Sequence, residues 1–106
     1  MWKPFDKGAT LGSNGSESGE TIRDEEHVLG ARITLERNAD IAPFSKACGI
    51  YGWMVHTRFF STENEAVVEY DKMKACLSEI VEPFSDPSYD RHATEEAMEA
   101  FVKDYP

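Results

Sequence analysis

A histidine and an arginine two residues apart are the side chains in this sequence best suited to chemistry. His56 and Arg58 stand near the end of a long apolar run, and in a strand they would point to the same side. A carboxylate from residues 24–26, brought beside His56 by an adjacent strand, would complete a pair able to act as general acid and base. The spacing supplies neither a nucleophile nor an oxyanion donor, so we assign no catalytic residue, and a histidine satisfied by a neighbouring carboxylate or carbonyl group is the simpler interpretation.

The histidines and cysteines do not have the spacing of a metal site. His27, His56 and His92 fall in a turn, a strand and a connection, and no two of them stand at a helical i, i+4 interval. The sequence therefore predicts no metal and no cofactor. Cys48 and Cys76 are interpreted as buried free thiols, and a disulfide between a strand and a helix stays open as the alternative.

An apolar and aromatic run over residues 47–60 predicts the strand that carries His56. Aromatic and branched residues are typical of strands, and here Tyr51 and Trp53 share one face. Both faces are apolar in the first half of the run, which favours an interior strand that opens to water near its end. The run is longer than the usual strand of about 5 to 6 residues, so a bend at Gly49 or Gly52 is expected.

A capped amphipathic helix is predicted directly after this strand. Thr62 and Glu65 have the spacing of a capping box, and apolar residues then recur at steps of three and four. Pro83 ends the helix. The apolar stripe of the helix, which includes Tyr70, is expected to cover the strand face that carries Trp53.

The rest of the chain completes an α+β fold. Residues 1–19 are rich in glycine and serine and are expected to form a flexible N-terminal tail ahead of a single domain over residues 20–106. The expected elements are strands at 20–24, 31–37 and 47–60, a connection at 38–45, a first helix from Thr62 and a second helix from about Thr94. The simplest topology is a three-stranded antiparallel meander followed by two C-terminal helices packed on one face.

Negative charge is concentrated in the C-terminal part of the chain. The net charge is −9, of which residues 63–106 carry −8 and residues 1–62 only −1. Such a surface repels phosphate backbones and attracts basic proteins, so nucleic acid is excluded as a partner, although an acidic surface also serves solubility alone. No apolar stretch approaches the ~20 residues of a membrane span, and the first residues lack the apolar core of a signal peptide. We therefore expect a cytoplasmic protein with no membrane contact.

Two classes of function fit these features, and the first is protein binding. Helices on one face of the sheet leave the other face partly bare unless the tail covers it, and bare apolar surface is typical of interfaces and ligand pockets. The protein would be a small acidic, non-enzymatic module that masks a basic partner, as inhibitor or immunity-type proteins do, or that pairs with itself as a homodimer. On the second helix, Glu95, Glu96 and Glu99 are the candidate interaction residues.

The second class is a small-ligand-binding protein or an enzyme. Its pocket would lie between the sheet and the helix, because aromatic, sulfur and basic side chains are expected to meet there. The candidate ligand-binding residues are Tyr51, Trp53, Met54, His56, Arg58 and Tyr70, with His56 and Arg58 at the mouth.

Overall fold

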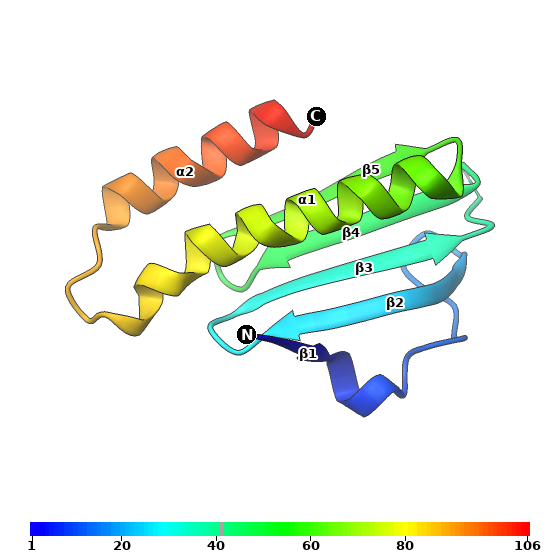
Figure 1. The fold of residues 1–106 in the computed structure, drawn as a ribbon, viewed down its shortest axis with the longest axis horizontal. Helices are drawn as coiled ribbons and strands as arrows, with labels where there is room; N and C mark the ends of the chain where they lie inside the picture. Colours follow the sequence, from blue (N-terminus) through cyan, green and yellow to red (C-terminus); the bar gives the residue numbers. More distant parts are fainter. Residues whose placement is uncertain (41) are drawn as a thin grey trace.

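Two layers make up the fold of residues 1–40 and 42–106, which the computed structural model describes (Figure 1). One layer is a single antiparallel sheet in the order β1-β2-β3-β4-β5, and the other consists of two helices packed on it. The α+β class and the meander topology are as predicted, but the sheet has five strands and not three. The elements are β1 (Trp2–Pro4), η1 (Phe5–Gly8), β2 (Glu20–His27), β3 (Ala31–Arg37), β4 (Phe44–Ile50), β5 (Met54–Phe60), α1 (Glu63–Val81), η2 (Glu82–Ser85) and α2 (Arg91–Asp104).

One of the additional strands arises because the predicted strand over residues 47–60 is in fact a hairpin. β4 ends at Ile50 and β5 begins at Met54, and the two strands are antiparallel neighbours. Gly52 in the turn between them has a φ of +81°, a conformation that glycine adopts readily. The bend expected at Gly52 is therefore a complete reversal of the chain. The pattern hid this reversal because Trp53, which follows the glycine, is an apolar residue in a turn position where polar residues are usual.

The other additional strand comes from the segment that the sequence assigns to a tail. β1 pairs antiparallel with β2, with Trp2 opposite His27. The Trp2 indole Nε1 donates to Ser78 Oγ of α1 at 2.6 Å, and its ring meets the His27 ring edge-on at 5.2 Å. These contacts attach the start of the chain to both layers, while the flexibility of residues 1–19 stays a prediction.

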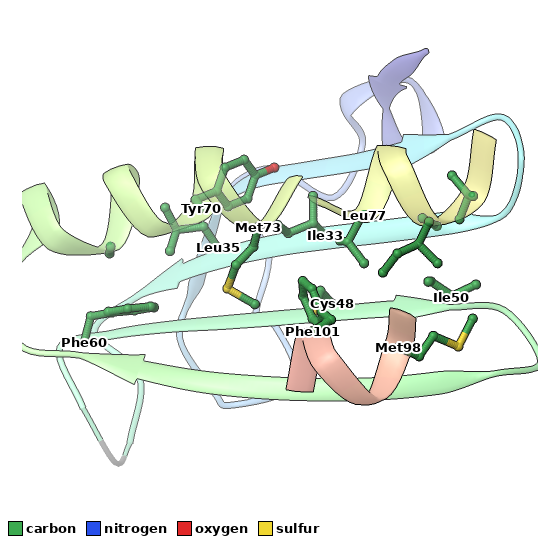
Figure 2. Close-up of a cluster of buried hydrophobic side chains, with 14 residues drawn as sticks. Ile33, Leu35, Cys48, Ile50, Phe60, Tyr70, Met73, Leu77, Met98 and Phe101 are labelled. Carbon is green, nitrogen blue, oxygen red and sulfur yellow. The ribbon is translucent and has the colours of Figure 1, made fainter. Parts of the chain in front are cut away.

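The two faces of the sheet differ in what covers them. On the helix face, the side covered by α1 and α2, Ile33 of β3, Cys48 of β4 and Phe60 of β5 are buried. Figure 2 shows these side chains meeting others from both helices in one apolar core. The largest labelled members of that core are Ile33, Leu35, Ile50, Phe60, Tyr70, Met73, Leu77, Met98 and Phe101. The opposite side, here called the open face, is the one that α1 and α2 do not cover.

The face of β5 that the helices cover is not the predicted one. Met54, His56 and Phe60 point to the helix face, because they stand opposite Ile50, Cys48 and Phe44 of β4 in the register of the hairpin. Tyr51 and Val55, which were expected under the helix, are 53% and 85% exposed. The alternation expected from one long strand holds across the hairpin, so the error lies in the choice of the face that the helix covers and not in the grouping of the residues.

Both helices form where the chain supplies a cap. Thr62 caps α1 by accepting a hydrogen bond from the Glu65 amide at 3.2 Å, and α1 ends at Val81, as the capping pattern and Pro83 predict. α2 begins at Arg91, three residues before the predicted start, because Asp90 accepts from the next amides and acts as its cap. No helix in the described part of the chain is long and apolar enough to cross a membrane.

The remaining boundaries differ by a few residues. β2 continues to His27, beyond the predicted end at residue 24, and the turn that follows uses Gly30 at a φ of +109°. The predicted connection at 38–45 includes Ile41, which lies outside the described residues. Its last two residues, Phe44 and Ser45, already belong to β4.

Candidate functional site

His56 is held by the C-terminal end of the chain and not by a carboxylate. Its Nε2 contacts the backbone oxygen of Tyr105, and its ring meets the Phe101 ring edge-on at 6.2 Å. The carboxylates of residues 24–26 lie on β2, which β3 and β4 separate from β5. The structure therefore does not bring these carboxylates to His56. The contact with a backbone oxygen is the simpler of the two interpretations that the sequence leaves open.

Arg58 is also occupied by neighbours within the chain. Its Nη1 pairs with Glu69 of α1 at 3.2 Å, and its Nε donates to the backbone oxygen of Pro106 at 3.0 Å. Both interactions lie on the helix face of β5. The side chain therefore connects β5 to α1 and to the end of the chain.

The space between the sheet and α1, where the sequence places a ligand pocket, holds packed side chains. Tyr70, Met73 and Leu77 are completely buried there. The Tyr70 hydroxyl donates to Glu25 Oε1 at 2.7 Å, and burial together with this carboxylate raises the pKa of Tyr70. Tyr70 is thus a core residue, and it does not meet the turn residues Tyr51 and Trp53.

A groove of 730 Å³ instead lies on the open face of the sheet. Its floor includes Thr34 of β3 and Ala47 and Gly49 of β4, and its two sides are residues 10–16 and the hairpin turn 51–53. We call it the open-face groove. Its volume is in the range of pockets that take small molecules or peptide side chains.

Polar side chains of β2 and β3 fix one side of the open-face groove. Arg32 donates to both carboxylate oxygens of the buried Asp24, at 3.0 and 2.7 Å. The pKa of Arg32 is raised by its hydrogen bonds to Asp24, against the opposing effect of burial. The Arg32 guanidinium also lies 3.5 Å from the centre of the Phe5 ring, and Thr10 donates to Asp24 at 2.8 Å. Asp24 therefore neutralises Arg32 and ties η1 and Thr10 to the sheet.

Glu36 attaches the next part of the N-terminal segment to the same face. Its buried carboxylate accepts hydrogen bonds from the amides of Gly19 at 2.9 Å and Glu17 at 3.2 Å. A Cβ at Gly15 would overlap this carboxyl group, so the glycine allows the backbone to pass close to it. The sequence gives one signal for this arrangement, which is the alternation of Arg32, Thr34 and Glu36 on the non-core side of β3.

A second groove, of 680 Å³, lies between the hairpin turn and α2. We call it the α2 groove. It brings together residues that the sequence assigns to two different sites, namely Trp53 and Met54 from the ligand set and Glu95 and Glu99 from the interaction set. The third member of the interaction set lies apart, because Glu96 pairs with His92 at 3.1 Å along the exposed side of α2.

Trp53 is the central aromatic residue of the α2 groove. Its ring stacks on Phe84 with the centroids 5.8 Å apart, and the Arg91 guanidinium lies 4.7 Å from the centre of the indole. Met98 and Val102 of α2 add apolar surface beside it. The arrangement offers an aromatic platform with two carboxylates and two basic side chains, Arg91 and Lys103, on the same helix, and it is suited to binding.

Among residues 1–40 and 42–106, no three histidine, cysteine or acidic side chains are placed to share a metal ion. His27, His56 and His92 lie on β2, β5 and α2. A scan against models of protein families found no match to this chain, and searches of curated proteins and of solved structures found no significant relative. Any function must therefore be argued from the two grooves and the charge of the chain.

Proposed function

We propose that this chain is a small acidic, non-enzymatic protein-binding module whose α2 groove binds a basic segment of another protein. The observation that carries this proposal is the meeting of Trp53 with Glu95 and Glu99 around one groove. Protein interfaces concentrate binding energy in aromatic anchors with charged groups at the rim. The groove has an apolar centre at the hairpin turn, and α2 lines it with Glu95 and Glu99 together with Arg91 and Lys103.

The chain's own Arg91 illustrates the kind of side chain that the groove accepts. Its guanidinium lies 4.7 Å from the Trp53 ring centre, and its Nε is 3.8 Å from Glu95 Oε1. Arg91 and Glu95 are 74% and 54% exposed, so this ion pair contributes little to folding. A partner's arginine or lysine would find the same aromatic ring and, in Glu99, a carboxylate with no ion pair among the described residues.

Acidic residues at the end of α1 favour the same reading. Glu79 in the last turn and Glu82 at the C-cap stand at the negative end of the helix dipole, and this turn contains no basic residue. Carboxylates at that position reduce helix stability by a few tenths of a kcal/mol each. Attraction of a basic partner to the helical layer would offset this cost, as would the solubility that an acidic surface gives.

The experiment that tests this function compares two charge reversals of equal size. The probe is a set of short fluorescent peptides, each with one aromatic residue flanked by arginine or lysine, measured by fluorescence polarisation at low and physiological salt. We expect a subset to bind, and we expect the double variant Glu95→Lys/Glu99→Lys to weaken that binding by about tenfold or more. Trp53→Ala should weaken it comparably and reduce the selectivity for aromatic peptides.

The matched control is Glu63→Lys/Glu65→Lys, which changes the net charge equally at the first turn of α1, away from the groove. This control should retain binding apart from a small, salt-sensitive loss. If both double variants weakened peptide binding equally, the loss would be explained by the net charge of the protein, and the proposed site would be contradicted. Absence of binding by every peptide in the set would contradict it as well.

A further inference from the structure

The open face of the hairpin has large side chains on one strand and small ones on the next. On β5 the residues that point to this face are Val55, Thr57 and Phe59, and directly opposite them on β4 stand Gly49, Ala47 and Ser45. Val55 is 85% exposed and Phe59 is 42% exposed. Ser45 is buried, so the open face has a ridge formed by Val55, Thr57 and Phe59 on β5 beside a short trough over Ala47 and Gly49 of β4.

The trough belongs to the open-face groove. Ala47 and Gly49 lie in its floor, and Val55 lies at its rim. A ridge and a hollow that are neighbours on one surface become partners when a second copy is placed by a two-fold axis, because each ridge then faces the other copy's hollow. Alternation of large and small side chains across two facing sheets is the arrangement that fills such a space well.

We infer that two copies of this chain pack with their open faces together, each placing Val55 and Phe59 into the trough over Ala47 and Gly49 of the other. Facing sheets pack about 10 Å apart, a spacing that interdigitating side chains fill. The occupant of the open-face groove is therefore the ridge of a second copy.

The charge distribution favours this face over any other for self-association. Two copies with a net charge of −9 repel each other, but residues 63–106, which carry −8, form the helical layer on the opposite side. On the open face Asp24 is neutralised by Arg32, and Glu36 is buried beneath the N-terminal segment. Contact through the open faces keeps the two acidic layers on the outside of the dimer, where their repulsion is smallest.

Continuation of the sheet from edge to edge would bring the two copies of α2 together, whereas contact through the open faces would not. β5 is an edge strand, and α2 packs beside it, with the Phe101 ring 6.2 Å from the ring of His56 on the helix face of β5. A second β5 added at the edge would lie about 4.8 Å away. The α2 helices of the two copies would then approach each other along the shared edge, and each α2 carries four carboxylates against two basic side chains. The open face is the side of β5 that remains accessible.

This dimer would present two α2 grooves on its outer sides, and it stands independently of the protein-binding function proposed above. The test is the mass of the full chain, measured by sedimentation equilibrium and by light scattering after gel filtration from micromolar to submillimolar concentration. We expect a mass of twice the 12.0 kDa of one chain at the upper concentrations. Val55→Glu and Phe59→Glu should each shift the equilibrium to the monomer.

The matched control is Val68→Glu, which introduces the same charge at a valine of α1 that is 44% exposed and should leave the dimer intact. Ala47→Leu fills the trough without adding charge and should also give a monomer, and circular dichroism establishes that each variant is folded. A wild-type chain that is monomeric at the highest concentration overturns the inference. A dimer that persists in folded Val55→Glu/Phe59→Glu overturns it as well, and neither result depends on binding of a basic peptide.

Discussion

Lys46 and Arg58 are cross-strand partners on the helix face of the sheet, yet among residues 1–40 and 42–106 only Arg58 of the two has a carboxylate partner. Glu69 pairs with Arg58 at 3.2 Å, whereas the completely buried Lys46 amine contacts the sulfur of Met73 and lies 5.3 Å from the centre of the Phe60 ring. Burial, reinforced by the nearby Arg58, lowers the pKa of Lys46 from 10.5 to about 8. A buried amine without a paired anion destabilises the fold. The charged amine loses its hydration, and the neutral amine loses its hydrogen bonds to water.

Replacement of Lys46 by methionine should therefore stabilise the protein. The lowered pKa corresponds to about 3 kcal/mol at neutral pH, and Lys46→Met removes this cost while keeping most of the volume of the side chain. We expect a gain of about 1 to 3 kcal/mol in the free energy of unfolding, measured by urea denaturation at pH 7. Lys72→Met, at an exposed position on α1, is the control and should change stability by less than about 0.5 kcal/mol. A loss of stability in Lys46→Met would contradict the prediction.

The lowered pKa of Lys46 also predicts how the difference in unfolding free energy between wild type and Lys46→Met depends on pH. Below pH 8 Lys46 is protonated in both the folded and the unfolded chain, so the cost of burying its charge is complete. Between about pH 8 and 10.5 the unfolded chain binds more protons than the folded one, and wild-type stability rises with pH. The advantage of Lys46→Met should therefore shrink over this window. Cysteines and tyrosines also titrate in this window. Both proteins contain them, so their contribution cancels in the difference between the two unfolding free energies.

The hydrogen bonds of Glu36 predict that its loss changes the protection of the N-terminal segment against amide hydrogen exchange. Loss of its carboxylate in Glu36→Ala leaves the amides of Glu17 and Gly19 without their acceptor, which should cost about 1 to 3 kcal/mol. Hydrogen exchange followed by mass spectrometry should show faster exchange over residues 10–19 and little change in α1. Glu20→Ala removes only an exposed ion pair with Arg37 and serves as the control. Equal exchange over residues 10–19 in Glu36→Ala and wild type would contradict this role of Glu36.

The two cysteines should differ in reactivity. Burial raises the pKa of Cys48 to about 11 and also raises that of the half-buried Cys76. At pH 8 the higher pKa alone reduces the reactive thiolate of Cys48 by about 100-fold relative to an ordinary thiol. Maleimide labelling of the native protein should modify Cys76 first and Cys48 only after unfolding. If both thiols stayed unreactive in denaturant without a reductant, the disulfide that the sequence leaves open would be present.

The sequence predicts those elements whose signals are local. Thr62 and Glu65 give the start of α1, and the alternation of Ile33 and Leu35 gives β3 with its core side. The hairpin at Gly52 is different, because its turn contains aromatic residues and the runs on both sides are apolar. Periodicity alone does not separate one long apolar strand from two short ones, and it does not say which of two apolar faces the helix covers. The alternation itself holds across the turn, because Cys48 and Ile50 share the helix face with Met54 and His56.

The candidate site was harder to predict, because its parts meet only through tertiary packing. Trp53 and Glu99 are chosen from the sequence for separate sites, and the return of α2 along β5 brings them to one groove. The role of Glu36 depends on the path of residues 15–19 over the open face, which glycine and serine composition does not specify. Local patterns therefore predict the elements, whereas the grooves follow from how these elements are connected.

Glu25 gives the last prediction, which concerns stability in acid. Its carboxylate accepts hydrogen bonds from Tyr70 and from Lys74 of α1, each at 2.7 Å. Burial acts to raise the pKa of Glu25, but the hydrogen bonds from Lys74 and Tyr70 outweigh it and hold the pKa below 4.5. A lowered folded-state pKa means that the stabilisation is complete above pH 4.5 and is lost as the pH falls through the folded-state value.

The variant Glu25→Gln should therefore be less stable than wild type at pH 7, and the difference should narrow as the pH falls below about 4.5. Tyr70→Phe should cost about 1 to 2 kcal/mol at pH 7, because it removes one hydrogen bond to a charged acceptor. Since both changes break the same contact, the double variant should lose less stability than the two single losses added together. Urea denaturation of the four proteins at pH 7 and pH 3.5 measures this. Additive losses at pH 7, or a Glu25→Gln deficit that does not change with pH, would show that Glu25 does not stabilise the fold through Tyr70.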